Sequence, residues 1–483
     1  MQMTISSILG ATETRLVSGE RSALVTGCSV DTRTVREGDL FVAFPGERVD
    51  GNDFVLDAAR AGAACVAMTR EPTAEELAAL EGAGCAVLVP VSPEPDQERL
   101  LLSLASLWRA SHEGCVIVGV TGSVGKTTTK EMLAAALGTL YPVHATSGNL
   151  NSMIGVALTV LSAPEDARVV VAEMGMNHAG ELWRQARAIR PNLAVITNVG
   201  TSHIGNLGSR EAIARAKAEV LSGLEPTPFA PGGGKRLFMR GEEDFRGLIA
   251  GGLAPLHGVD VTLVGESAED DVRGGDVEVG GDGLASFTVT YADGEQARLG
   301  LSVPGAHVVP DALFALAVAD YLRCDREAAR AAVSAVRPAA MRLEAVTAEG
   351  RPRVLDDSYN ASPASMAGAL DVLRSMACEG RRVAVLGEMG ELGDEAARLH
   401  ALVGAYAAAC GVDLLACVGG ELADEIAGGA TTMGMSPDRV ERFADPHEAA
   451  SVLGPVLSCD DLVLAKASRA AGLDAFAREV LGR

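Results

Sequence analysis

The sequence predicts an α/β protein with three domains. The chain has 483 residues, which is too long for one ordinary hydrophobic core. Its apolar, strand-like segments alternate with helical segments, and this rhythm is typical of sheets that are covered by helices. The character of these segments changes along the chain, so we place the domains at residues 1–110, 111–338 and 339–483.

The first and third domains show the same alternation with different strands. In the first, short strands alternate with alanine-rich helices such as FVLDAARAGA; the strands are DLFVAFPG, ACVAMT and CAVLVPV. In the third, polar residues follow the apolar strands, which are RVLDDSY, RRVAVLGEMG, DLLACVGG and DLVLAKAS. Both patterns predict strands joined through helices.

The central domain begins with longer and more uniformly apolar strands. These are CVIVGVTG, ARVVVAEMG and NLAVITNVG, and each precedes a helical segment, which predicts a parallel sheet. Residues 225–300 are rich in Gly, Pro and acidic residues. They contain three alternating pieces that predict antiparallel strands or a hairpin insertion, namely VTLVGE, ASFTVTYADG and ARLGLSV.

Composition narrows the class of protein. The formal charge of −23 argues against general affinity for nucleic acid or anionic membranes, but a few basic residues and helix N-termini still suffice for an anionic small ligand. The nine cysteines are odd in number and form no CxxC pair, which favours a reducing compartment. The N-terminus lacks the pattern of a signal peptide, and no apolar run reaches the ~20 residues of a membrane span. We expect a cytoplasmic protein.

A phosphate-binding loop is the strongest motif. The segment GVTGSVGKTTTKEM (119–132) follows a strand and opens a helix, although Val120 departs from the strict GxxxxGK[ST] spacing. Backbone N–H groups of the glycine turn can surround a phosphate, while Lys126 reaches its oxygens and Thr127 binds Mg²⁺. The candidate ATP contacts are Thr121, Gly122, Ser123, Val124, Gly125, Lys126, Thr127 and Thr128.

Polar residues at neighbouring strand ends extend this site. Glu173 ends the strand in ARVVVAEMG, and His203 follows the strand in NLAVITNVGTSH. Ligands of an open parallel sheet bind at this edge, so Glu173 and His203 together favour a Mg²⁺ site over a capping acid and a packed histidine. Asn149 and Asn151 in SGNLNSMIG either form turns or donate to a transferring phosphate.

Residues 209–224, SREAIARAKAEVLSGL, predict a helix with an inward-facing lysine. Ser209 is a suitable N-cap, and Lys217 lies in the apolar stripe that includes Ile213 and Val220. On this segment alone, the simpler interpretation is a lysine whose ammonium reaches water along an apolar stem.

Nearly the whole chain resembles the Mur ligases, the ATP-dependent amino acid ligases of peptidoglycan synthesis. The segment DDSYNASP resembles the members that add D-alanyl-D-alanine, and the DNPR-type signature of members that add a diamino acid is not seen in the third domain. The matching segments are SVDTRTVREGDLFVAFPGERVDGNDF, GVTGSVGKTTTKEML, GNLNSMIGVALTVL, AEMGMNHAGEL, ITNVGTSHIGNLGSREAIARAKAEVL, AAMRLE, DDSYNASPASM and AVLGEMGELG.

The resemblance implies a function for each domain. The N-terminal domain would hold the UDP end of UDP-MurNAc-tripeptide, the central domain would be a P-loop ATPase, and a Rossmann-like C-terminal domain would close over the site. The reaction would use ATP and Mg²⁺ to join D-Ala-D-Ala to the tripeptide through an acyl phosphate, in a monomer without nucleic acid. The alternatives are another Mur or folyl-type amino acid ligase, a non-catalytic, ligase-like subunit that binds nucleotide, and an unrelated P-loop ATPase coupled to motion.

The resemblance also assigns roles to residues. Lys126, Glu173, His203 and Lys217 would be catalytic, and Lys217 would carry a carbamate that holds a second Mg²⁺ with His203; Thr127 and Glu173 complete the metal ligands. Further ATP contacts are Asn149, Asn151, Asp311, Arg342 and Asp357. The contacts with the UDP-sugar are Asp31, Thr32 and Arg33, and those with the dipeptide are Asn360 and Ser362.

Three segments depart from the family pattern. Asp311 in GAHVVPD stands where an asparagine normally reads adenine, and Asp can only accept hydrogen bonds where Asn can also donate. Asn52 ends a segment that is otherwise DGH, and Ala467 interrupts a segment that is otherwise KGSR. The first departure bears on the choice of nucleotide, and the other two bear on the substrate contacts.

Overall fold

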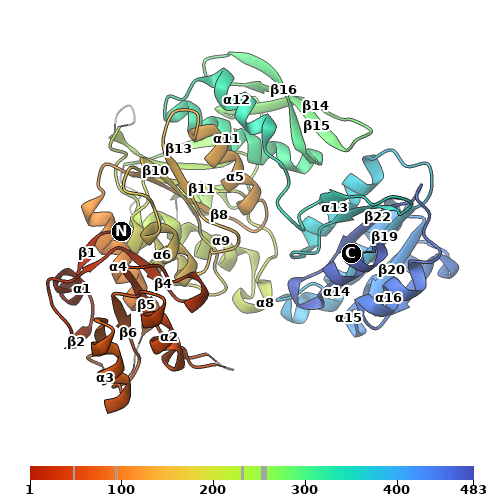
Figure 1. The fold of residues 1–483 in the computed structure, drawn as a ribbon. Coiled ribbons are helices and arrows are strands. Elements are labelled where there is room, and N and C mark those ends of the chain that lie inside the picture. The colour runs from red at the N-terminus through yellow and green to blue at the C-terminus, as the bar shows by residue number, and fades with distance from the viewer. Residues whose placement is uncertain (47–48, 93, 95, 230–232, 252–257, 483) are drawn as a thin grey trace.

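The computed structural model describes residues 1–46, 49–92, 94, 96–229, 233–251 and 258–482. Positions 47–48 of the quoted N-terminal segment, and 230–232 and 252–257 of the glycine-rich stretch, lie outside these ranges. Three α/β units follow one another along the chain, each with its own sheet, and this confirms the predicted fold class (Figure 1).

The N-terminal unit contains a five-stranded sheet of order β2-β7-β6-β5-β4, in which only β2 is antiparallel to its neighbour. The three predicted strands correspond to β5, β6 and β7. The elements are β1 (Met3–Thr4), α1 (Ile5–Ala11), β2 (Thr14–Ser18), β3 (Leu24–Val25), β4 (Gly27–Ser29), η1 (Thr32–Thr34), β5 (Asp39–Val42), η2 (Gly51–Phe54), α2 (Val55–Arg60), β6 (Cys65–Ala67), α3 (Ala74–Gly82), β7 (Ala86–Pro90) and α4 (Gln97–Ser111).

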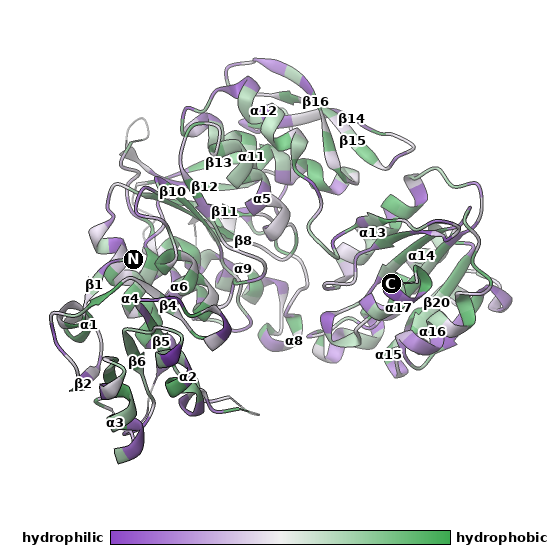
Figure 2. Cartoon of the chain, in the orientation of Figure 1, coloured by the Kyte–Doolittle hydropathy of each residue, from purple (hydrophilic) through white to green (hydrophobic). Residues whose placement is uncertain are grey.

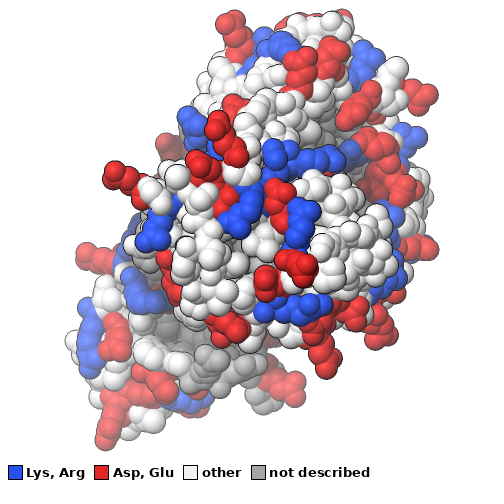
Figure 3. All heavy atoms as spheres, turned by 90° about the vertical axis from the view of Figure 1, so that its right-hand side faces the viewer, with Lys and Arg blue, Asp and Glu red and all other residues white. Residues whose placement is uncertain are grey.

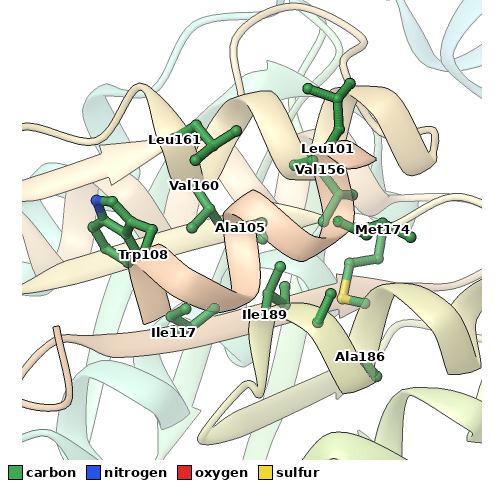
Figure 4. Packing of buried hydrophobic residues seen from close by; sticks show 14 of the residues in the cluster. Leu101, Ala105, Trp108, Ile117, Val156, Val160, Leu161, Met174, Ala186 and Ile189 are labelled. Atoms are coloured by element: carbon green, nitrogen blue, oxygen red, sulfur yellow. The ribbon is translucent and has the colours of Figure 1, made fainter. Parts of the chain in front are cut away.

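Helix α4 attaches this unit to the central one. Its apolar side packs against α6 (Met153–Leu161) and α7 (Glu181–Ile189), and Ala105 of α4 lies between Val160 and Ile189 (Figure 4). Burying a large apolar side chain is worth roughly 1.5–3 kcal/mol, so this shared core fixes how the two units are joined.

The central unit contains a nine-stranded sheet of order β16-β15-β14-β13-β12-β11-β8-β10-β9, which is parallel from β9 to β14. The strands are β8 (Val116–Thr121), β9 (Val143–Ala145), β10 (Val169–Glu173), β11 (Leu193–Ile196), β12 (Lys235–Arg240), β13 (Val259–Gly265), β14 (Val272–Val279), β15 (Leu284–Thr290) and β16 (Gln296–Pro304).

One expectation for the glycine-rich stretch is wrong. The piece VTLVGE, which is β13, pairs in parallel with β12, because the chain reaches it through a crossover that contains α10 (Arg246–Gly251). The two later pieces, β15 and β16, are antiparallel as expected. They extend the edge of the central sheet and form no separate insertion.

Helices cover both faces of the central sheet. One face carries α5 (Lys126–Leu137), α11 (Val309–Tyr321) and α12 (Arg326–Ala335), whose buried side chains include Met132, Leu133 and Leu137 as expected. The other face carries α4, α6, α7 and α9 (Arg210–Ala218). The remaining short elements are α8 (Ile204–Leu207), η3 (Glu219–Gly223) and η5 (Ala306–Val308).

The C-terminal unit has a six-stranded sheet of order β17-β18-β22-β19-β20-β21, parallel except for β17. The four predicted strands are β18, β19, β20 and β22. The elements are β17 (Glu344–Val346), β18 (Arg353–Asp356), α13 (Pro363–Ser375), β19 (Arg382–Gly387), η6 (Gly393–Glu395), α14 (Ala396–Ala409), β20 (Leu414–Val418), α15 (Glu421–Thr432), η7 (Pro437–Arg439), β21 (Val440–Phe443), α16 (Pro446–Leu453), β22 (Leu462–Lys466), η8 (Arg469–Ala471) and α17 (Asp474–Val480).

The link between the central and C-terminal units is tightly held. Residues 336–343 connect α12 to β17, and both Met341 and Leu343 have left-handed backbones with φ of 58° and 53°. The backbone N–H of Leu343 donates to Asp357 at 3.2 Å, and that of Tyr359 donates to the Met341 carbonyl at 3.2 Å. The connection is therefore hydrogen-bonded to the C-terminal unit and is not a flexible linker.

The distribution of apolar and charged residues is that of a globular α/β protein. Apolar residues concentrate in the sheets of all three units (Figure 2). On the face shown in Figure 3, basic and acidic side chains are interspersed over the C-terminal unit. In the described part of the chain, no helix combines the length and apolar character needed to cross a membrane. All nine cysteines are free thiols.

Candidate nucleotide and metal site

The phosphate loop joins β8 to α5 at the carboxyl edge of the central sheet. Gly122 and Gly125 have φ of 151° and 85°, where a side chain would strain the backbone. A Cβ on Gly122 would also lie 1.8 Å from the Thr197 hydroxyl oxygen. Lys126 begins α5, and its ammonium donates to the Gly122 carbonyl at 2.9 Å. The loop therefore has the compact turn and the overlying cation that the motif predicts.

Two residues at the end of β11 hold this loop. The Thr197 hydroxyl donates to the Val124 carbonyl at 2.6 Å. The Asn198 amide bonds both the N–H and the carbonyl of Val124 at 3.1 Å, and the Asn198 carbonyl accepts from the N–H of Ser123 at 3.1 Å. Neither residue was assigned a role from the sequence, although Asn198 could be placed at the end of this strand, at the ligand-binding edge of the sheet.

Glu173 and Thr127 form the acidic part of the site. Glu173 is buried at the end of β10, where it accepts from the Thr127 hydroxyl at 2.9 Å and from the Asn151 amide at 2.7 Å. Adjacent oxygen ligands of an octahedral Mg²⁺ are about 2.9 Å apart, since each lies roughly 2.1 Å from the ion. The Thr127–Glu173 pair therefore fits a magnesium ion, and Asn151 orients the carboxylate. Asn149 contributes its backbone carbonyl to the Asn151 N–H at 2.7 Å, as a turn residue would.

Lys217 lies inside the protein, as the helical pattern predicted. The helix is shorter than expected: α9 spans Arg210–Ala218 with Ser209 as N-cap, and the 3-10 helix η3 continues it. Lys217 is 1 % exposed, so the interpretation of an ammonium reaching solvent is wrong. Within the described residues its ammonium has no hydrogen bond and no ion pair.

The surroundings of Lys217 disfavour its charged, ammonium form. Burial, followed by the nearby charge of Lys126, lowers the pKa of Lys217 well below its ordinary value. Burial also lowers the pKa of Lys126, with Glu173 opposing that change. Two amines that repel each other in a buried site create a place suited to an anion.

His203 faces the C-terminal unit. It precedes α8 with a left-handed backbone, φ 64°, and its Nδ1 contacts the carboxylate of Glu391. Over the described ranges, no three His, Cys, Asp or Glu side chains gather around one possible metal position. Glu173 and His203 would each need Thr127, a modified Lys217 or ligand oxygens to complete a coordination sphere.

Asp311 lies behind the phosphate loop. The Thr129 hydroxyl on α5 donates to Asp311 Oδ1 at 2.9 Å, and a Cβ on Gly125 would lie 2.5 Å from the same oxygen. Burial raises the pKa of Asp311 from 3.8 to about 7, although the bond from Thr129 opposes this. The carboxyl therefore supports the loop from the α11 side.

The free energy of unfolding of Asp311→Asn should increase relative to that of the wild type as the pH rises. Between about pH 4 and pH 7 the unfolded carboxyl ionises while the buried one stays protonated, so the wild type loses stability over this range and levels off above it. Asn does not titrate. We expect the difference in unfolding free energy between Asp311→Asn and wild type to grow by about 2–3 kcal/mol from pH 5 to pH 8.

Urea unfolding at these two pH values measures that difference. The exposed Asp166→Asn, in the turn before β10, serves as the control and should show no such growth. A constant difference for Asp311→Asn would show that the carboxyl is ionised in the folded protein.

The edge of the C-terminal sheet carries a second polar group. Asp357 forms a 2.6 Å ion pair with Lys466, and Lys466 also donates to the Asn360 carbonyl at 2.9 Å. Ser362 caps α13, where its hydroxyl accepts from the Ser365 N–H. The structure thus places Asp357 and Lys466 together at the ends of β18 and β22, with Ser362 at the start of α13.

Arg342, in the link to the C-terminal unit, approaches the phosphate-loop helix. Its guanidinium lies 4.1 Å from the centre of the Tyr359 ring, and it lines a small hollow together with Thr127 and Thr128. Asp357, in contrast, is bonded to Lys466 and to the link. The structure therefore brings Arg342 to the loop, and it holds Asp357 within its own unit.

The predicted UDP-sugar residues form a local turn in the N-terminal unit. Asp31 caps η1, and bonds from Arg33 lower the pKa of Asp31 to about 2. Thr32 lies within the same 3-10 turn. In the segment that departs from DGH, the buried Asn52 amide donates to Asp50 at 2.8 Å and to Thr69 at 2.6 Å. Asn52 therefore supports the loop.

A phosphate loop on a parallel sheet, with an acid at the next strand and a Rossmann-like unit facing it, defines a nucleotide-dependent enzyme of the P-loop type. Family models match three segments: the Mur ligase family, catalytic domain at 24–94, the Mur ligase middle domain at 120–319, and the Mur ligase, glutamate ligase domain at 341–469. The chain belongs to the Mur ligase family.

Two curated relatives are similar over nearly their full length, and both are named UDP-N-acetylmuramoyl-tripeptide--D-alanyl-D-alanine ligase. The protein from Bacillus subtilis (strain 168) is 34% identical over 464 residues, covering 95% of this chain and 93% of its own. The protein from Mycobacterium tuberculosis (strain CDC 1551 / Oshkosh) is 34% identical over 487 residues, covering 94% and 92%.

Solved structures agree with this grouping. MurF from Acinetobacter baumannii superposes with a TM-score of 0.85 at 26% identity, covering 100% of this chain and 99% of its own. MurF from Thermotoga maritima in complex with ADP has a TM-score of 0.77 at 24% identity, covering 95% and 97%, and shares the fold.

Proposed function

We propose that this protein is an ATP-dependent ligase that joins D-alanyl-D-alanine to UDP-N-acetylmuramoyl-tripeptide, giving the pentapeptide precursor of peptidoglycan. The observation that carries the proposal is the match with relatives of that name over more than nine-tenths of both chains. The phosphate loop, Glu173 and the buried Lys217 at one sheet edge supply the site that such a reaction needs.

ATP and Mg²⁺ are the proposed cofactors. The N–H groups of residues 121–128 would surround the phosphates, with Lys126 on the β and γ oxygens. Thr127 and Glu173 would hold a magnesium ion, and His203 with a modified Lys217 would hold a second one. Bound magnesium would neutralise charge that develops on the transferring phosphate.

The first step makes an acyl phosphate. The terminal carboxylate of the tripeptide attacks the γ-phosphorus in line; an O–P bond forms, and the bond to ADP breaks. Lys126 stabilises the negative charge on the moving phosphoryl group, and the N-terminus of α5 adds its N–H groups. No side-chain nucleophile takes part, so positioning supplies most of the rate.

In the second step the amine of D-alanyl-D-alanine attacks the acyl carbon. The C–N bond forms, phosphate leaves and the amine loses a proton. We assign Asn360 and Ser362 to the dipeptide, and Arg342 and Asp357 to the nucleotide from the C-terminal side. We assign Asn149 and Asn151 to the ATP side, and Asp311 acts there through the loop. Asp31, Thr32 and Arg33 would meet the UDP-sugar.

Lys217 would act as a carbamate. CO₂ adds only to a neutral amine, and the lowered pKa of Lys217 raises the neutral fraction. Addition to the neutral amine forms an N–C bond and releases one proton, which leaves an anionic carbamate beside Lys126. The negative charge of the carbamate then attracts the Lys126 ammonium.

The domains would be residues 1–110 for the UDP-substrate, 111–338 for ATP and 339–483 for ligation. The protein would act as a monomer in the cytoplasm, in keeping with nine free thiols.

Phosphate release by the purified protein tests the function. ATP, Mg²⁺, UDP-MurNAc-tripeptide and D-Ala-D-Ala are supplied together, and each is then omitted in turn. Release that requires both the tripeptide and the dipeptide supports the proposed ligase. Release with ATP alone, or with another amine in place of the dipeptide, would contradict it.

A further inference from the structure

The central and C-terminal units meet where α8 approaches η6, at a junction that includes His203. Figure 1 shows α8 at the side of the central unit that faces the C-terminal unit. Glu391 contacts this region twice: its carboxylate lies against Nδ1 of His203, and its carbonyl accepts from the N–H of Gly205 at 3.0 Å. One residue of the C-terminal unit therefore holds both ends of this short segment.

The junction is closely packed. A Cβ on Gly205 would lie 2.6 Å from the Gly393 nitrogen, and a Cβ on Gly393 would lie 2.7 Å from the Gly205 Cα. Ile204 packs both against the apolar core of the central unit and against that of the C-terminal unit. The two backbones therefore touch without room for a side chain, and Ile204 is shared by both cores. These contacts indicate a specific interface between the two units.

The segment that carries Glu391 is itself fixed. Both His203 and Glu391 have left-handed backbones, with φ of 64° and 62°, and such residues persist only where the surroundings hold them. The buried His400 accepts the N–H of Met389 at 2.8 Å through Nε2 and bonds the Ala396 carbonyl through Nδ1. These contacts thus fix the position of the backbone that carries Glu391.

We propose that Glu391 is a positioning residue for the metal site of the central unit. This inference rests on the proposed function, in which His203 is a metal ligand. By binding Nδ1, Glu391 fixes the ring and leaves Nε2 as the nitrogen available to the ion, the arrangement by which carboxylates orient metal-binding histidines elsewhere. Because Glu391 belongs to the C-terminal unit, metal affinity in the central unit depends on docking at this junction.

Binding of Mn²⁺ to the full chain, followed by electron paramagnetic resonance, tests the role of Glu391 without using activity. His203→Ala sets the loss that follows from removing the ligand. We expect Glu391→Gln to weaken Mn²⁺ binding by about tenfold, the lower end of the effect for partners of metal ligands. Glu395→Gln is the matched control, since Glu395 lies in η6 and, among the described residues, its carboxylate pairs with the exposed Arg398 alone.

Two further variants separate the carboxylate from the fold. Gly393→Ala keeps Glu391 but forces the junction apart, and it should weaken Mn²⁺ binding to the same extent. Glu391→Asp should recover part of the affinity, since Asp tolerates a left-handed backbone. The melting temperature of each variant is measured, and metal affinities are compared between variants of equal thermal stability.

Unchanged or tighter Mn²⁺ binding in Glu391→Gln would overturn the inference, because the carboxylate would then be irrelevant to His203 or would compete with the metal. The inference also fails if His203→Ala binds Mn²⁺ like the wild type. Ligase turnover of the wild type is measured separately. A wild type that makes no pentapeptide would contradict the proposed function, while the Mn²⁺ series would still report on Glu391.

Discussion

Replacing Lys126 by alanine should reduce kcat for pentapeptide formation by about 10³-fold, the upper range for removing one group that stabilises transition-state charge. Lys126 is the cation of the phosphate loop, and its ammonium already lies over the loop, 2.9 Å from the Gly122 carbonyl. Without it, the charge on the γ-phosphoryl oxygens has no direct counterion from this helix. Steady-state release of phosphate measures the effect.

Lys235→Ala is the matched control for Lys126→Ala. Lys235 begins β12, so it lies at the opposite, amino edge of the same sheet. The control should retain wild-type kcat. A Lys126→Ala variant that keeps its kcat within tenfold of wild type would contradict the assignment of the loop.

Replacing Lys217 by alanine should lower kcat by at least about 10²-fold, because a group that completes the metal site is lost. The expected signature is rescue: added formate or acetate can enter the space left by the side chain and stand in for the carbamate. Lys217→Met fills that space with an apolar chain of similar length, so it should be equally impaired and should not respond to carboxylates.

Carbon-13 magnetic resonance of the wild type under labelled CO₂ provides a second measurement. A carbamate carbon signal should appear, and it should be absent from Lys217→Met. Full activity in Lys217→Ala, without added carboxylate, would contradict the role of Lys217 in the metal site.

The sequence predicted the three-unit architecture because its signals were local. Apolar strands such as that before Gly122 are buried on both faces and read as continuous apolar runs. The short strands β17 and β21 were missed, since three or four residues with charged members carry almost no periodic signal. The direction of β13 was misjudged because alternation identifies a strand but not its partner.

For the site, the sequence located residues better than it located their contacts. The burial of Lys217 followed from helical spacing, and Glu173 at a strand end followed from sheet topology. The contact between Thr129 and Asp311 joins residues 182 positions apart, and no local pattern encodes such a distance. The pairing of His203 with Glu391 depends on how two units dock, which strand and helix patterns do not specify.

The link at Met341 and Leu343 has a mechanical consequence. A left-handed backbone costs a residue other than glycine roughly 1–2 kcal/mol, so the two such residues that flank Arg342 put conformational strain into the link. The hydrogen bonds to Asp357 and Tyr359 hold the link in this strained conformation. A rotation of the C-terminal unit that breaks these hydrogen bonds would let the backbone relax. The released strain energy would then offset part of the free-energy cost of the rotation, independently of substrate binding.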